Sequence, residues 1–569
     1  MVNTEIAKIF RQISQILEIK GENVFRIRAY QRAAENIEGE SEDLEKLAKE
    51  GRLREIPGIG IDLSERIKEF LASGKIKFFA ELQKSIPQGL LEILDIPSVG
   101  PKKAKLLFEK LKIKNIAGLE KAIRQNKLSG VFGIKQKTVE NILKGIEISK
   151  LGKERLTLAQ AAEIGDAFVS ALKTLAEVKK ISLAGSLRRQ KETVRDIDIL
   201  VVSRHPRKVM DAFVSLPQAK NIQAKGQTKA SLRTSEDVQV DCRVVEDKSF
   251  GAAQMYFTGS KEFNIKMRQL ALKKGLKVNE YGIFRGEKFL CGRSEEEIFK
   301  FFGMEFIPPE LRENNGEIEL ARINQLPHLI ELKDLKGDPH THSIWSDGKN
   351  SIEDLADACI KRDYSYVAVT DHSQGLKVAN GLTLSGLKKK KAEIQRLNGK
   401  FKNFTVLYAA EVDIDAKGKL DYPDEVLAEF DLVVAAIHSG FKQSGEQITR
   451  RIVKACENKF CHIIAHPTGR LWGEREAYDF DFAQILEAAR DTNTHLEINS
   501  FPRRLDLNDS HARQAKEAGV KMVISTDAHR VEQLEAMKFG VAVARRGWLE
   551  AKDVMNTLPL KGLLKAIKK

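Results

Sequence analysis

The sequence is poor in cysteine and has no long hydrophobic run. Its 5 cysteines are scattered over 569 residues and form no Cys-x-x-Cys pair, which argues against a disulfide framework and a thiolate zinc site. No stretch reaches the roughly 18 uninterrupted apolar residues of a membrane span, and the N-terminus is amphipathic, unlike a signal peptide. These absences predict a protein of the reducing cytoplasm, without a membrane partner.

Acidic residues are outnumbered by basic ones. The chain has 95 Lys and Arg against 80 Asp and Glu, a formal charge of +15. Such an excess commonly accompanies a polyanionic partner, and nucleic acid is the leading candidate. A surface that lysines merely solvate is the alternative. The length allows roughly four domains of about 150 residues each.

The first quarter of the chain has apolar residues at helical spacing and repeats one plan. LREIPGIGIDLSERIKEFL and LLEILDIPSVGPKKAKLLFEKL both read as helix, tight glycine-containing hairpin, helix, and LSGVFGIKQKTVENILKGI is a looser third copy. Such hairpins aim backbone N–H groups at an anion without reading bases. The repeats therefore favour binding to a phosphate backbone over ordinary structural hairpins.

Two acids stand directly before a strand in RDIDILVV. Side chains alternate along a strand, so Asp196 and Asp198 share one face, and at about 5 Å two such charges repel by roughly 3 kcal/mol. Asp241 in VQVDCRVV lies on one face with Arg243. If the two strands are neighbours, three carboxylates converge and suit two Mg²⁺ ions. Acids on a solvated sheet face are the alternative.

The last part of the chain alternates short apolar runs with helices, which predicts βα repetition. Each run ends in a polar residue, the place where barrel active sites are built. Nine candidate metal ligands with nitrogen or oxygen donors stand at or just after the ends of these runs: His340, His342, Asp347, His372, Glu411, His438, His466, Asp527 and His529. Imidazole and carboxylate without thiolate suit Mn²⁺, Zn²⁺ or Fe²⁺.

GSLRR, DID, DCR, YFTGS and FNIKMR together resemble the family X DNA polymerases over roughly residues 1 to 320. The resemblance implies a nucleotidyltransferase palm in which Asp196 and Asp198 hold two Mg²⁺ or Mn²⁺ ions and Asp241 helps activate the primer 3′ hydroxyl. The N–H, hydroxyl and guanidinium groups of the GSLRR motif suit a triphosphate. The implied nucleotide-binding residues are Gly185, Ser186, Arg188, Arg189, Tyr256, Phe257, Gly259 and Asn264, with Arg243 and Arg268 on the template side.

NVFRIRAYQRAAENI with IPGIG resembles the small domain that grips a 5′-phosphate in DNA gaps. The implied DNA contacts are Arg26, Arg28, Tyr30 and Arg32, with Gly58, Gly60, Gly100 and Lys102 in the hairpins, where a monovalent cation is also expected. Arg66 stands where lyase members carry a Schiff-base lysine, and a guanidinium cannot serve as that nucleophile. Lyase activity is therefore not expected unless Lys68 substitutes. Ser98 replaces the first glycine of the second hairpin, which predicts looser DNA binding there.

GDPHTHSIWSDG and the later ligand runs resemble the polymerase and histidinol phosphatase (PHP) domain over residues 336 to 569, a barrel with up to three metals. Pro339 removes one strand N–H and makes the local pairing uncertain. Asp413, Arg470 and Arg503 are interpreted as surface residues, with phosphate contact as the alternative.

The predicted fold is a multidomain chain of α and α/β parts. We expect a helical 5′-phosphate-binding domain at 1–85, a helical fingers-like domain at 86–152, a palm at 153–246, an α/β thumb at 247–314, a linker at 315–335 and a distorted (βα)7 barrel at 336–569.

The predicted enzyme is a monomeric, cytoplasmic, nucleoid-associated DNA polymerase that fills short gaps in repair. It would use deoxynucleotides and gapped or primer-template DNA, act with other repair proteins, and carry 3′ to 5′ exonuclease or abasic-site endonuclease activity in the barrel. Two alternatives stay open: an untemplated or ribonucleotide-adding nucleotidyltransferase, and a DNA-binding scaffold with a small-molecule phosphatase.

Overall fold

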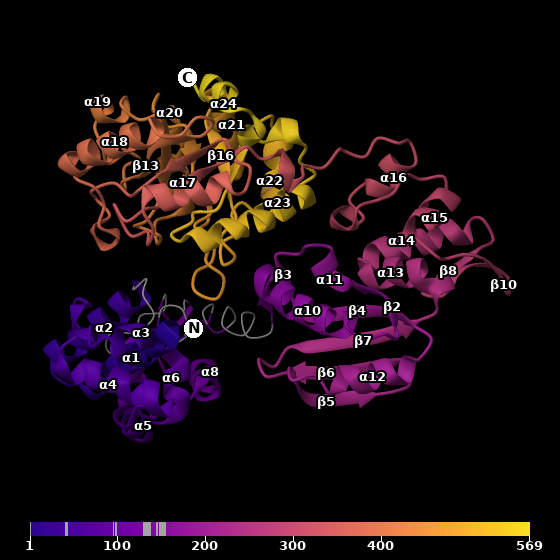
Figure 1. The fold of residues 1–569 in the computed structure, drawn as a ribbon, viewed down its shortest axis with the longest axis horizontal. Helices are drawn as coiled ribbons and strands as arrows, with labels where there is room; N and C mark the ends of the chain where they lie inside the picture. The colour runs from indigo at the N-terminus through magenta and orange to yellow at the C-terminus, as the bar shows by residue number, and fades with distance from the viewer. Residues whose placement is uncertain are drawn as a thin grey trace. The chain divides into compact units, whose positions relative to one another are not determined.

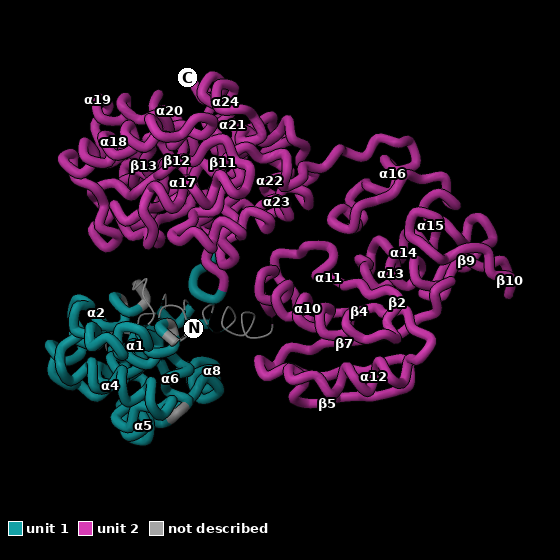
Figure 2. Tube along the Cα trace, viewed as in Figure 1, with its two compact units in different colours: residues 1–153, 473–476 teal, residues 154–472, 477–569 magenta. Residues whose placement is uncertain are grey.

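The computed structural model describes residues 2–39, 44–94, 96, 99–128, 138–140, 142–143, 146 and 155–569. The chain forms two compact units, residues 1–153 with 473–476 and residues 154–472 with 477–569 (Figure 2). Ser98 and most of the looser third hairpin copy lie outside the described residues, so the predictions for them have no structural counterpart here.

The described elements of the first unit are all helical, as the apolar spacing predicts. They are α1 (Val2–Lys20), α2 (Val24–Gly39), α3 (Leu44–Lys49), η1 (Leu53–Glu55), α4 (Ile61–Ser73), α5 (Lys77–Lys84), α6 (Gln88–Leu94), α7 (Pro101–Leu111) and α8 (Ile116–Arg124). Gly58 turns the first hairpin at a φ of +80°, and Gly60 precedes α4 in an extended conformation. Two apolar cores, one around Phe10 and one around Leu107, hold these helices together.

The second unit begins with a mixed five-stranded sheet in the order β2-β4-β7-β6-β5. Ile197, Ile199 and Val201 of β4 face a buried core with Phe168 and Phe213 of the covering helices. The elements are β1 (Leu156–Thr157), α10 (Leu158–Lys173), β2 (Val178–Leu183), α11 (Gly185–Arg188), β3 (Thr193–Val194), β4 (Asp196–Ser203), α12 (Pro206–Val214), β5 (Ala219–Lys225), β6 (Lys229–Thr234) and β7 (Gln239–Val245).

A smaller α/β part follows the sheet. Its elements are η2 (Asp247–Ser249), α13 (Phe250–Thr258), α14 (Lys261–Leu272), β8 (Lys277–Asn279), β9 (Gly282–Arg285), β10 (Lys288–Cys291), α15 (Glu295–Phe301), η3 (Pro309–Leu311) and α16 (Glu317–Ala321). The three strands pair antiparallel in the order β10-β9-β8. A separate core containing Phe263 and Phe299 packs under them.

The rest of the unit is a nearly closed barrel of seven parallel strands in sequence order (Figure 1). Bonds between the first strand and the segment after the last close it, since His342 N donates to the Ala528 carbonyl at 2.8 Å and Asp527 N to the His340 carbonyl at 3.0 Å. The register shifts between Asp338 and Thr341, beside Pro339. The predicted fold class, including the sevenfold barrel, is confirmed.

The strands of the barrel are β11 (Gly337–Thr341), β12 (Tyr366–Val369), β13 (Thr405–Asp413), β14 (Leu432–Ala436), β15 (Ile463–Ile464), β16 (His495–Asn499) and β17 (Met522–Ser525). Its helices are α17 (Ile352–Ile360), α18 (Leu384–Asn398), α19 (Asp424–Leu427), α20 (Gly445–Glu457), α21 (Phe482–Asp491), α22 (Asp509–Glu517), α23 (Met537–Arg546) and α24 (Leu560–Ala566). Short 3-10 helices are η4 (Leu332–Asp334), η5 (Lys377–Ala379), η6 (Val531–Ala536), η7 (Ala551–Asp553) and η8 (Met555–Thr557). None of the described helices is long and apolar enough to span a membrane.

Candidate functional site

The three acids of the mixed sheet lie on two neighbouring strands. Strands β4 and β7 run parallel with Asp198 directly across from Asp241, and Asp196 lies two residues earlier on the same face as Asp198. The backbone of β4 therefore brings together carboxylates that are more than 40 residues apart in sequence.

The carboxyl group of Asp198 is strongly perturbed by its surroundings. Burial, together with the charges of Asp196 and Asp241, raises the pKa of Asp198 to about 7, against the opposing effect of Arg243. A nearby cation would therefore favour the ionised form of this carboxyl group at neutral pH. An all-oxygen set of this kind suits a hard divalent ion such as Mg²⁺.

The loop before β4 approaches this cluster closely. Gly185 has a φ of +64°, and a side chain at this position would collide with the Asp198 carboxylate. Only glycine therefore lets the first turn of α11 lie against the acids. Ser186 follows in the same turn. Arg189, just after α11, donates from Nε to Glu313 at 3.1 Å and from Nη1 to the Thr258 carbonyl.

Arg188 already has partners within the protein, and its contact with a nucleotide stays a prediction. Its Nη2 pairs with Glu295 at 2.6 Å and its Nη1 donates to Thr258 Oγ1 at 2.7 Å. Glu295 is also paired with Arg312, whose side chain is fully buried. Arg188 thus joins the sheet to the following α/β part, through partners 70 and 107 residues away in sequence.

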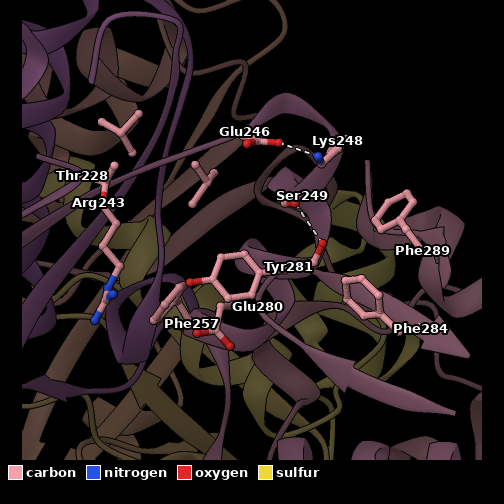
Figure 3. A pocket seen from close by; sticks show the side chains of 12 residues that line it. Thr228, Arg243, Glu246, Lys248, Ser249, Phe257, Glu280, Tyr281, Phe284 and Phe289 are labelled. Atoms are coloured by element: carbon pink, nitrogen blue, oxygen red, sulfur yellow. Dashed lines mark hydrogen bonds and ion pairs between the residues drawn. The ribbon is translucent and has the colours of Figure 1, made fainter. Parts of the chain in front are cut away.

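A cavity of about 400 Å³ opens beside the strand that carries Asp241 (Figure 3). The Arg243 guanidinium carbon lies over the Phe257 ring, 4.6 Å from its centroid, and Glu280 and Tyr281 line the same space. Arg243 therefore stands at the junction of the sheet and the α/β part. No described contact assigns it to a template strand.

The remaining predicted nucleotide residues gather around the end of α13. The Tyr256 and Phe257 rings meet edge to face at 5.3 Å, and Gly259 ends the helix. Asn264 on α14 donates to the Tyr256 carbonyl at 2.7 Å. Arg268, one turn further along α14, is exposed. These residues form one local group, and their contact with a nucleotide stays a prediction.

The predicted DNA contacts of the first unit are mostly exposed. Exposed positions are Arg26, Arg28, Arg32, Gly58, Gly60, Gly100 and Lys102. Tyr30 is the exception and the prediction for it is wrong: it is 1% exposed and packs against Phe10 and Phe78. Burial raises the pKa of Tyr30 to about 12. Its ring is a core residue because α2 turns that face inward.

Arg66 forms an ion pair and a cation–π contact, as is typical of a guanidinium group. It pairs with Asp62 at 3.1 Å and lies 4.2 Å from the centroid of the Phe78 ring. Lys68, the substitute considered for a Schiff base, pairs with Glu65 at 2.8 Å in an exposed position. Neither arrangement resembles a desolvated nucleophilic lysine.

The nine predicted barrel ligands meet at the carboxyl ends of the strands. Eight of them form three overlapping groups whose ligand atoms lie within 4.8 Å of one another: His342 with Asp347, His372 and His529; His340 with His342 and Asp527; and His372 with Glu411 and His438. The ninth, His466, places Nε2 3.0 Å from the Glu411 carboxylate. Shared residues link the groups, so the geometry can hold a cluster of metal ions.

The donor set fits metal ions on independent grounds. The Nδ1 atoms of His342 and His466 are buried and have no hydrogen-bond partner among the described residues. Burial, with His529 and His372 nearby, lowers the pKa of His342 to about 4, so this ring is neutral and able to ligate. Burial opposes ionisation of Glu411, but the surrounding histidines hold its pKa well below the ordinary value.

Sequence reasoning missed the residues that orient these ligands. Glu497 is fully buried and accepts hydrogen bonds from His340 Nδ1 at 2.6 Å, from the His466 amide at 2.6 Å and from the Ser525 hydroxyl. Asp338 accepts from the Thr526 amide at 3.2 Å. The available signal was a glutamate between two aliphatic residues, Leu496 and Ile498, in the predicted strand HLEINS.

Two residues interpreted as ordinary surface residues have specific partners, so that interpretation is wrong for them. Asp413 hydrogen-bonds His438 Nδ1 and orients that ligand. Arg470 pairs with Glu192 at 2.6 Å and donates to the backbone of residues 504 and 505. Arg503 is exposed and donates to the Trp472 carbonyl at 3.3 Å.

Four protein families match parts of the chain. They are a helix-hairpin-helix domain at residues 1–76, a SAM-like helix-hairpin-helix tandem at 90–147, the DNA polymerase beta thumb at 253–313 and the PHP domain at 338–501. These matches cover the hairpins, the α/β part after the mixed sheet and the barrel.

Relatives with known names match the same parts. The DNA polymerase/3′-5′ exonuclease PolX of Bacillus subtilis (strain 168) is 42% identical over 565 residues, 99% of this chain and 98% of its own length. A probable phosphatase of Thermoanaerobacter sp. (strain X514) is 28% identical over 231 residues, 39% of this chain and 89% of its own length. DNA polymerase lambda of Rattus norvegicus is 25% identical over 293 residues, 45% of this chain and 48% of its own length. The chain belongs to the family X DNA polymerases that carry a PHP domain.

Proposed function

We propose that this enzyme fills short gaps in DNA during repair, with extension in the palm and 3′-end trimming in the barrel. It is a DNA polymerase with a 3′ to 5′ exonuclease, as its similarity over 99% of the chain to an enzyme of that name indicates. The assignment of the two activities to different parts of the chain rests on the chemistry of their candidate ligands. The palm offers only carboxylates on β4 and β7, whereas six of the nine barrel ligands are imidazoles.

The palm residues support a two-metal extension step. Two Mg²⁺ or Mn²⁺ ions, when bound to Asp196, Asp198 and Asp241, would neutralise the triphosphate and favour an ionised primer hydroxyl. Asp241 would accept the hydroxyl proton. Arg189 would hold the triphosphate from the side of α11, and the Tyr256–Phe257 pair would crowd a ribose 2′-hydroxyl.

The barrel residues support hydrolysis of a phosphodiester. Mn²⁺, Zn²⁺ or Fe²⁺ bound to the nine ligands would supply a hydroxide at neutral pH and stabilise charge on phosphorus. Glu497 and Asp413 would keep His340 and His438 in ligating orientation. Abasic-site cleavage would use the same chemistry.

The first unit would select the DNA end. Its exposed arginines on α2 and the hairpin amides near Gly58 would grip a 5′-phosphate across a short gap. We propose that the enzyme acts as a monomer and hands its product to other repair proteins.

One gapped-duplex assay tests the assignment. Asp241→Asn should lower extension by about three orders of magnitude and leave trimming unchanged, because only the palm loses an oxygen ligand. His342→Ala should do the reverse. Exposed Asp237→Asn, four residues from Asp241 on the loop before β7, is the matched control and should alter neither activity. Extension that survives in Asp241→Asn, or a product that does not follow the template, would refute the proposal.

A further inference from the structure

The loop that follows α11 is tied to the barrel at both of its ends. It runs from Arg189 to Glu192, and Gln190 within it has a φ of +56°. Arg546, the last residue of α23, donates from Nη1 to the Arg189 carbonyl at 2.9 Å. Arg470, also in the barrel, pairs with Glu192 at 2.6 Å. A short strained loop of the palm is thus fastened by two barrel arginines.

A second chain of contacts reaches the Arg189 side chain itself. Arg546 Nη1 lies 3.1 Å from a Glu313 carboxylate oxygen, and the same oxygen accepts from Arg189 Nε at 3.1 Å. Lys191 Nζ stands 3.8 Å from this oxygen. Burial opposes ionisation of Glu313, but the surrounding cations hold its pKa below the ordinary value. One carboxylate therefore links the palm arginine to the barrel arginine.

The barrel arginine is rigidly placed. Its Nε and Nη2 both donate to the Asp509 carboxylate on α22, at 2.9 and 2.6 Å, and its side chain is 4% exposed. Such a two-pronged guanidinium contact fixes direction as well as distance. The network is mostly removed from solvent, since the Glu313 and Arg189 side chains are 19% and 13% exposed. Displacing one member should therefore shift the others.

The contacts of Arg189 fix the orientation of its guanidinium group but leave one nitrogen available for a ligand. Nε binds Glu313 and Nη1 binds the Thr258 carbonyl, whereas Nη2 has no hydrogen bond among the described residues. A guanidinium has five N–H donors in a fixed plane, so fixing two nitrogens aims the third. If Glu313 instead prevented Arg189 from binding a phosphate, its carboxylate would be expected to occupy both Nη1 and Nη2.

We propose that Arg546 and Glu313 are positioning residues for the polymerase: the barrel, through them, sets the direction in which Arg189 meets the incoming nucleotide's triphosphate. This inference rests on the proposed triphosphate role of Arg189. It makes the barrel a structural part of the nucleotide site in addition to its own chemistry.

The test is steady-state extension of a gapped duplex by the full-length enzyme in Mg²⁺, with the nucleotide concentration varied. Arg546→Met and Glu313→Gln should each raise the KM for nucleotide about tenfold and change kcat by less than about threefold. Arg546→Lys, which keeps the charge and loses the fork, should fall between. Trimming in Mn²⁺ by Glu313→Gln should stay near that of the parent, although the loss of this partly buried charge should lower the unfolding midpoint.

Arg545→Met is the matched control. Arg545 is the neighbouring residue on α23 and also spans the junction, pairing with Glu310 at 2.7 Å and with the Ile330 carbonyl, but it contacts neither Glu313 nor Arg189. Its loss should leave the KM within about twofold. A rise equal to that of Arg546→Met would show general loosening of the junction and overturn the inference.

Arg189→Gln separates this inference from the proposal on which it rests. It should raise the KM, and adding Arg546→Met to it should raise the KM by less than twofold more, because Arg546 acts through Arg189. If Arg189→Gln leaves the KM unchanged, the triphosphate role and the inference both fail. If Arg189→Gln raises it but Arg546→Met and Glu313→Gln do not, or the double variant shows a full multiplicative effect, the inference alone fails.

Discussion

At the scale of single residues, Asp198 links metal binding to protons. Burial and two neighbouring acids raise its pKa to about 7, so in the metal-free protein the carboxyl is mostly protonated at pH 6 and mostly ionised at pH 8. A cation that binds at pH 6 must displace this proton. Mg²⁺ affinity of the palm should therefore fall by up to about tenfold for each pH unit below 7.

Calorimetric Mg²⁺ titration of His342→Ala in buffers of different ionisation enthalpy would measure this release with the barrel site disabled. Nearly one proton should leave at pH 6 and almost none at pH 8. Asp198→Asn in the same background removes the titrating group and should abolish the difference. A pH-independent affinity between 6 and 8 would contradict the burial argument.

Glu497 is the residue-scale test of the barrel. It accepts from His340 Nδ1, the His466 amide and the Ser525 hydroxyl. Glu497→Gln should lower barrel metal affinity about 10- to 100-fold, because it weakens the hydrogen bond that orients His340. Metal content after dialysis reports this loss directly, with trimming as a second readout. The control is Glu429→Gln, which removes an exposed carboxylate paired with Lys391 and should not change the metal content. If Glu497→Gln retains all of its metal, Glu497 does not orient the ligands.

At the scale of elements, the junction of palm and thumb depends on one buried carboxylate. Glu295 at the start of α15 is 2% exposed and lies between Arg312, which is 0% exposed, and Arg188. Glu295→Gln would leave two guanidinium groups without their counter-charge. We expect a loss of about 3 to 5 kcal/mol of unfolding free energy, measured by denaturant titration. Glu446→Gln, which breaks an exposed pair with Arg450, should cost less than about 1 kcal/mol.

Glu295 also predicts how the unfolding free energy changes at acidic pH. Burial opposes ionisation of Glu295, but Arg312 and Arg188 lower its pKa to about 2, below the value of 4.5 of a free glutamate. Its contribution is therefore fully present above pH 4.5 and is lost as the pH falls towards 2. The stability difference between parent and Glu295→Gln should shrink over that window. A difference that stays constant from pH 6 to 3 would contradict the pairing.

The helices of the first unit predict a preference for phosphorylated gaps. Arg28 on α2 is exposed, one helical turn before Arg32, whose side chain lies close to Gly58. Arg28→Ala should weaken binding to a one-nucleotide gap with a 5′-phosphate more than to the unphosphorylated gap, and should reduce the salt slope by about 1. Exposed Arg124 on α8 provides the control. Equal binding of both gaps by the parent enzyme would exclude this role.

The local sequence pattern predicted the helices and strands, whereas the environment of several side chains depends on residues that are distant in sequence. Helical spacing and strand-end ligands suffice for the hairpins, the DID strand and the barrel, because each depends on residues near in sequence. Arg470 was misinterpreted for the opposite reason, because its partner Glu192 is 278 residues away in sequence. The burial of Tyr30 likewise depends on Phe78, which belongs to another helix. The pairing of Arg188 with Glu295, 107 residues away, could not be predicted from local sequence either. Glu497 was missed because the sequence does not show that His340, His466 and Ser525 meet at its carboxylate.

At the scale of the whole molecule, the chain carries two clusters of candidate metal ligands with different chemistry. The palm presents oxygen only, and the barrel presents mostly imidazole. Mg²⁺ prefers hard oxygen ligands and binds neutral histidine poorly, so it should support extension but not trimming. Trimming should require Mn²⁺ or another transition ion. The two activities of one polypeptide should therefore be separable by metal alone.

The most direct measurement is a gapped-duplex assay of the parent enzyme and His342→Ala, in Mg²⁺ and in Mn²⁺, that scores 3′ extension and 3′ trimming on the same gel. Both proteins should extend equally in either metal. Only the parent should trim, and only in Mn²⁺. Normal trimming by His342→Ala in Mn²⁺, or loss of its extension in Mg²⁺, would contradict the assignment of separate functions to the palm and the barrel.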